Sequence, residues 1–141
     1  MFWIVFIASI LLGSMLFFTI IVTPNIFSTL DTTSARKFIR KIFPKLYLWC
    51  IALNSILLIF LFKEFDFKFF LAGLSIFLFI ISRQFLIPKI NHYADLEISI
   101  GESERQDFSK SSNKKFKKLH SLSVILFSIS FLCVAIILYL I

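Results

Sequence analysis

The sequence predicts an all-α fold: an integral membrane four-helix bundle with a short interfacial amphipathic helix between helices 1 and 2. The first observation is composition, because 59% of the 141 residues are hydrophobic, 16% are charged and the mean hydropathy is +0.93. A soluble domain of this size has about 25% charged residues and cannot hide so much apolar surface from water. The second observation is four long uncharged segments separated by charged ones. Together they argue against a soluble enzyme, a disordered chain and a disulfide scaffold.

The four membrane-spanning helices follow from the uncharged segments. We expect them at about 2–24, 44–62, 68–88 and 117–140, in a single domain that covers residues 1–141. The segment from Phe2 to Val22 alone is long enough to cross a hydrocarbon layer about 30 Å thick. Pro44 suits the first turn of the second helix, where its missing N–H needs no partner, whereas Pro24 either kinks or ends the first helix. Arg83 lies close enough to the end of the third helix for its side chain to reach the interface.

The distribution of charge predicts the orientation of the helices. The segments 31–45 and 83–118 carry thirteen of the fifteen Lys and Arg residues, and the link 63–68 carries the other two. Because cytoplasmic segments are enriched in Lys and Arg, residues 31–45 and 89–116 are predicted to be cytoplasmic and the N- and C-termini extracytoplasmic. Basic blocks beside apolar segments favour contact with the anionic headgroups of a bacterial inner membrane rather than with nucleic acid.

The first cytoplasmic segment has the pattern of an amphipathic helix that follows Asp31, a good N-cap residue. Its apolar residues recur at helical spacing, at Ala35, Phe38, Ile39, Ile42 and Phe43, and its basic residues on the other face are Arg36, Lys37, Arg40 and Lys41. We therefore predict a helix over 33–43 that lies in the interface, with Phe38, Ile42 and Phe43 toward the acyl chains and the four basic residues on lipid headgroups. The alternative is that the charges serve only to orient the protein.

The second cytoplasmic segment is longer and mixed in charge. Residues 91–108 have a helical composition that Gly101 interrupts, which predicts an extension of the third helix. Residues 109–113 are rich in Ser and Asn, which predicts a break before the last helix.

A candidate polar cluster lies toward the cytoplasmic half of the bundle: His120, Ser123, Arg83, Asn54 and Pro24. An ionisable residue within a membrane segment is a functional candidate by default. We expect the cluster to open to the cytoplasm and to be ringed by Phe17, Phe27 and Tyr47. Its role is either to hold the helices in register through buried hydrogen bonds or to receive a lipid headgroup or a small ligand.

The sequence contains no pattern typical of catalysis or of a cofactor site. It has no pair of acids within an apolar segment, no glycine-rich phosphate loop and no Cys or His spacing suited to a metal, and Cys50 and Cys133 are expected to be buried apolar residues. We therefore expect no catalytic residue, no metal and no cofactor. The favoured function is a non-enzymatic module that packs with lipids, with copies of itself as a homo-oligomer, or with another membrane protein. The alternatives are a small oligomeric transporter or permeability factor and, less favoured, a membrane oxidoreductase that binds haem through His92 and His120.

Several short motifs follow one another in order along the chain. They are Gly13, Phe17-Phe18, Thr23-Pro24-Asn25-Ile26-Phe27 and Leu30, then Ile42-Phe43-Pro44, Tyr47 and Asn54, and last Phe116-Lys117-Lys118-Leu119-His120-Ser121-Leu122-Ser123. In these motifs the whole chain resembles the transmembrane protein 205-like family. The resemblance implies a small four-helix membrane protein with no established molecular activity, whose bacterial members are described only as a domain of unknown function. One position departs from the family, which usually has Asn four residues after the second signature Ser, where this chain has Phe127.

Overall fold

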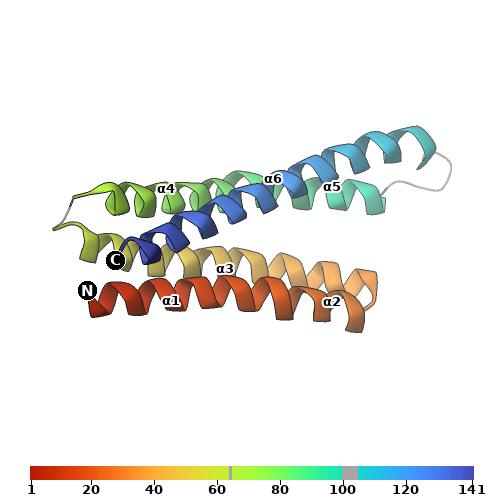
Figure 1. Cartoon of the computed structure of the whole chain (residues 1–141). Helices are drawn as coiled ribbons and strands as arrows, with labels where there is room; N and C mark the ends of the chain where they lie inside the picture. The colour runs from red at the N-terminus through yellow and green to blue at the C-terminus, as the bar shows by residue number, and fades with distance from the viewer. Residues whose placement is uncertain (64, 100–104) are drawn as a thin grey trace.

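The computed structural model describes the backbone of residues 1–63, 65–99 and 105–141, and their side chains except at 32, 33, 94–99, 105–113 and 116. The elements are α1 (Phe2–Phe17), the π-helix η1 (Phe18–Val22), α2 (Thr23–Thr29), α3 (Thr32–Leu61), α4 (Phe67–Ile81), the π-helix η2 (Ser82–Leu86), α5 (Ile87–Ser99) and α6 (Arg105–Tyr139). They join into four long helical rods (Figure 1). Each rod contains a segment that is long and apolar enough to cross a membrane: Phe2–Thr29, Ser34–Leu61, Phe67–Tyr93 and Lys117–Tyr139. The all-α, multi-pass prediction is therefore confirmed.

The rods pack as an antiparallel bundle in which each helix has two neighbours. α1 packs against α3 and α6, and α4 packs against the same two helices from the other side. Both termini and the turn between α3 and α4 lie at one end of the bundle, and the α2–α3 connection lies at the other, together with α5 and the start of α6 (Figure 1). We call this second end the basic end, because the described parts of the basic segments 31–45 and 83–118 lie toward it. At the basic end, the paired α5 and α6 diverge from α2 and α3 (Figure 1).

Three aromatic rings from three different rods meet in the middle of the core. The ring centroid of Tyr47 on α3 lies 5.8 Å from that of Phe79 on α4 and 6.2 Å from that of Phe127 on α6, and the latter two lie 6.2 Å apart. Tyr47 and Phe79 are both fully buried. Aromatic pairs at these separations add to the stability gained from their buried area, so this aromatic triad joins α3, α4 and α6.

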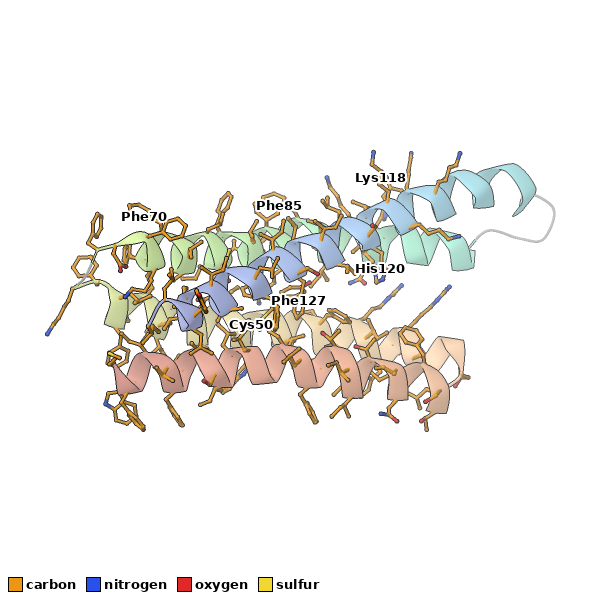
Figure 2. The ribbon with its side chains drawn as sticks, in the orientation of Figure 1. Cys50, Phe70, Phe85, Lys118, His120 and Phe127 are labelled. Carbon is orange, nitrogen blue, oxygen red and sulfur yellow. The ribbon has the colours of Figure 1, made fainter. Side chains whose placement is uncertain are left out.

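The outer surface of the bundle is apolar, as a lipid-facing surface must be. Only 28–33% of each candidate span is buried inside the bundle, and the exposed side chains include Phe70, Phe77 and Phe85. Figure 2 shows Phe70 and Phe85 pointing away from the neighbouring helices. In water such a surface would be an aggregation hazard, whereas in a bilayer it faces acyl chains.

The predicted short interfacial helix is not a separate element. Residues 33–43 are helical, but they form the first part of α3, which passes Pro44 without a break. The apolar stripe packs on the bundle: Ala35 is 1% exposed, and the ring of Phe43 lies 5.2 Å from that of Phe18 on η1. The prediction of a separate interfacial helix is therefore wrong: Ala35 is buried against the bundle, Ile39, Ile42 and Phe43 are half-buried, and only Phe38 of the stripe is exposed.

Two acidic residues cap the N-termini of helices: Asp31 caps α3 and Asp66 caps α4. Asp31 Oδ2 accepts a hydrogen bond from Ser34 N at 3.1 Å, and Asp66 Oδ1 accepts one from Lys68 N at 3.1 Å. Asp66 also pairs with the Lys68 ammonium at 3.2 Å. Desolvation raises the pKa of Asp66, but the hydrogen bond and charge of Lys68, with the backbone N–H groups of Phe69 and Lys68, outweigh it and hold that pKa below its usual value.

The prolines Pro24 and Pro88 each follow a π-helical turn by two residues. Proline donates no N–H and crowds the carbonyl four residues before it. In both places the preceding residue bonds five residues back, from Thr23 N to Phe18 O and from Ile87 N to Ser82 O. This wider turn lets both rods continue, so the first helix does not end at Pro24 but runs on through α2 to Thr29.

The second cytoplasmic segment is helical over most of its length. α5 extends the third rod to Ser99, as predicted, whereas Gly101 lies outside the described residues. The predicted break at 109–113 is wrong, because α6 runs through it from Arg105. α6 packs against α5, and packing between helices overrides the modest helix propensity of residues such as Ser and Asn.

We expect Phe79→Ala to lower the free energy of unfolding by about 3–5 kcal/mol, since it leaves a cavity in the aromatic triad. Phe77→Ala on the lipid-facing side of α4 is the matched control, because Phe77 is 58% exposed, and it should cost much less. Unfolding in detergent by a chemical denaturant measures both. Equal losses of unfolding free energy in the two variants would contradict the contribution of the aromatic triad to the core.

Candidate functional site

The five residues of the predicted cluster differ in how far the structure buries them. Asn54 and Ser123 are buried, Arg83 is half-buried, and Pro24 and His120 are exposed. Figure 2 shows His120 on the side of α6 opposite Lys118, facing the half of the molecule that holds α3. Of the three residues expected to ring the cluster, only Tyr47 is buried; Phe17 and Phe27 are 57% and 61% exposed.

One polar contact lies between the aromatic triad and the end that carries the termini. Asn54 Nδ2 on α3 donates to Ser75 Oγ on α4 at 2.7 Å, and both residues are fully buried. Two further polar atoms of the core, Asn54 Oδ1 and Ser130 Oγ, have no hydrogen-bond partner among the described residues. Because it joins residues of two helices, the Asn54–Ser75 hydrogen bond fixes α3 against α4.

A second polar contact lies between the aromatic triad and the basic end. The hydroxyls of Tyr47 on α3 and Ser123 on α6 share a hydrogen bond of 3.1 Å. The hydroxyl of Ser82 on η2 faces the same phenol, but it has no bond of good geometry with a described residue. Three rods thus bring three hydroxyl groups together below the basic end.

Arg83 follows Ser82 on the π-helical turn η2. Its Nε atom is buried, and no described residue accepts a hydrogen bond from it. The side chain as a whole is half-buried. A charged side chain within a membrane span is energetically costly unless an opposite charge neutralises it.

Sequence reasoning singled out Asn54, Ser123 and Arg83 but missed Ser75 and Ser82. The signal was present, because Ser75, Phe79 and Ser82 are spaced by four and three residues and so share one face of the third rod. Small polar residues at that spacing mark a helix face that packs closely on its neighbours.

The basic residues of the first segment divide into two kinds. Lys37 and Lys41 are exposed, whereas Arg36 and Arg40 are half-buried. Arg40 Nη2 donates to the backbone oxygen of Asn91 on α5 at 3.4 Å, and on the neighbouring hairpin the Lys115 ammonium lies 5.8 Å from the ring centroid of Tyr93. Arg40 thus connects the two basic segments to each other.

We expect Asn54 and Ser75 to show a coupling energy of about 0.6–1.7 kcal/mol, the range found for hydrogen bonds between membrane helices. The measurement is a double-mutant cycle of Asn54→Ala and Ser75→Ala on the unfolding free energy in detergent. Ser55→Ala is the control, because the Ser55 hydroxyl donates within α3 to Ile51 O at 2.8 Å. Additive losses for the Asn54 and Ser75 variants would contradict the contact.

Comparison with known proteins identifies the family. The model of one family, "Domain of unknown function (DUF4149)", matches residues 6–99. This region is about two thirds of the chain and includes α1 to α5, with Tyr47, Asn54, Ser82 and Arg83. Searches of curated proteins and of solved structures found no match. The chain therefore belongs to the DUF4149 family.

Proposed function

We propose that this protein is a non-enzymatic membrane module that binds anionic lipid headgroups at its basic end. The observation that carries the proposal is that two basic segments far apart in the sequence lie at the same end of the bundle and touch through Arg40 and Asn91. The exposed Lys37 and Lys41 lie on the same stretch of α3. Each basic residue close to an anionic leaflet contributes roughly 1 kcal/mol of attraction, so several together form a strong headgroup site.

The same charge distribution supports an orientation with the basic end in the cytoplasm. Thirteen of the fifteen Lys and Arg residues belong to the two segments that converge there, and Lys63 and Lys68 flank the turn at the other end. By the positive-inside rule, both termini then face outward across a bacterial inner membrane. The resemblance to the transmembrane protein 205-like family supports a multi-pass protein of this kind.

A second candidate function is a small transporter that acts as an oligomer. The unpartnered Asn54 Oδ1 and Ser130 Oγ within the described core favour it, because polar atoms inside a bundle mark solute paths in transporters. The core around them is filled with apolar side chains such as Leu57 and Val134, so a path requires contact between protomers. Solute flux into liposomes separates this candidate from the first.

The proposed orientation predicts which introduced cysteines react from each side of the membrane. In a variant with Cys50 and Cys133 replaced by Ala, a cysteine appended after Ile141 should react with an impermeant maleimide added outside intact cells. Lys41→Cys should react only after the membrane is permeabilised. The reverse pattern would overturn the orientation.

The proposed lipid binding predicts enrichment of phosphatidylglycerol around the protein. After purification from mixed phosphatidylglycerol and phosphatidylcholine vesicles, the lipid retained by the wild type should be richer in phosphatidylglycerol than the vesicles. Lys37→Gln with Lys41→Gln should reduce this enrichment severalfold, and so should high salt, which screens exposed charges.

Lys63→Gln at the other end is the control for this measurement. Lys63 lies beside two acids in the link 63–68, so its removal should leave the enrichment unchanged. Equal retention of both lipids by the wild type would overturn the proposal.

A further inference from the structure

Arg83 lies within the third candidate span, and among the described residues no acid pairs with its guanidinium and none accepts a hydrogen bond from its buried Nε. It follows Phe67, the start of the third span, by sixteen residues, which is about 24 Å along the helix axis. In a hydrocarbon layer about 30 Å thick, this places the Cα atom just inside the layer at the basic end. The described acids do not compensate it, because Asp31 caps α3 and Asp66 caps α4 and pairs with Lys68.

Ser82, which precedes Arg83 on η2, and the Tyr47–Ser123 pair that Ser82 faces all carry hydroxyl groups. Ser82 is 1% exposed, and its hydroxyl has no partner of good geometry among the described residues. The hydroxyl groups of Ser82, Tyr47 and Ser123 carry three protons and make two mutual contacts, so one proton remains for a further acceptor. A guanidinium beside unused hydroxyl donors is a surrounding that favours an anion.

The depth of Arg83 in the bilayer and the planar shape of its guanidinium favour a phosphoryl group as the anion. The planar guanidinium fork binds two oxygens of a phosphate at once, and the depth of Arg83 lies next to the level where phospholipid phosphates begin. η2 packs against both α3 and α6, so the π-helical turn that carries Arg83 and Ser82 lies where three rods meet. π-helical turns occur frequently at functional sites.

We propose that Arg83, with Ser82 beside it and the Tyr47–Ser123 pair behind it, binds a phosphoryl oxyanion at the basic end. The oxyanion is either the phosphate of an anionic phospholipid or a free phosphate ion, both of which meet the same donors. The proposal rests on the proposed lipid-binding function and deepens it, since it assigns one specific headgroup site apart from the exposed lysines of α3.

The experiment measures the thermal unfolding of the full chain in nanodiscs of three kinds: phosphatidylcholine alone, phosphatidylcholine with phosphatidylglycerol, and phosphatidylcholine with added inorganic phosphate. Phosphatidylglycerol should raise the Tm of the wild type by roughly 2–8 °C. Arg83→Gln should lose most of that rise, and Ser82→Ala should lose part of it. In phosphatidylcholine alone, the Tm of Arg83→Gln should equal or exceed that of the wild type, because the variant no longer contains an uncompensated charge.

Lys63→Gln is the control, because Lys63 is an exposed cation at the opposite end of the bundle, outside the basic end. It should retain the full rise. A different result is that inorganic phosphate raises the Tm of the wild type but not of Arg83→Gln, while phosphatidylglycerol raises neither. That result would keep the oxyanion site, with a free phosphate ion as its ligand, and would overturn the lipid-binding function.

Two other results would overturn the site. A full rise in Arg83→Gln, together with its loss in Lys37→Gln with Lys41→Gln, would leave the lipid function standing and remove Arg83 from it. No rise in the wild type with either phosphatidylglycerol or phosphate would remove both proposals. Arg83→Lys provides a further check, because it keeps the charge and loses the fork, so it should retain only part of the rise.

Discussion

The absence of water from the hydrocarbon layer is the constraint on which the rest of this structure depends. Backbone groups there must pair within helices, and the four rods satisfy this requirement even where prolines interrupt the pattern, through π-helical turns ahead of Pro24 and Pro88. Hydroxyl groups on the outer surface meet the same requirement locally. Thr19 and Ser128 donate to carbonyl oxygens one turn earlier, at 2.9 Å in both cases. The polar groups left for contacts between helices are therefore few.

Those few polar groups form two pairs, which the rings of Phe79 and Phe127 separate. Asn54 and Ser75 meet on the side of the termini, Tyr47 and Ser123 meet on the side of the basic end, and the rings of Phe79 and Phe127 lie between the two pairs. The partly buried ring of Phe127 packs on Phe79 and fills the core between the two polar contacts.

The basic end combines the features that bear on function. Its two segments are joined through Arg40 and Asn91, and α5 and α6 diverge there from α2 and α3 (Figure 1). Arg83, whose Nε has no partner among the described residues, lies just beneath it. A surface of exposed lysines attracts many anionic headgroups weakly, whereas a half-buried guanidinium beside hydroxyl donors selects one oxyanion by geometry. This difference between diffuse and specific attraction separates the lipid surface from the site that we assign to Arg83.

The sequence by itself determined the four helices, their apolar outer surface and the imbalance of charge between the two ends, because each of these depends on residues close together in the chain. Only the tertiary structure decided that Ala35 is buried and that Phe43 packs on Phe18 of η1, since an amphipathic pattern is the same whether lipid or a neighbouring helix covers it. It also decided which polar residues meet. Asn54 pairs with Ser75 and not with the exposed His120, because such contacts depend on the rotation of each rod about its axis, and that rotation follows from packing along the whole length of four helices.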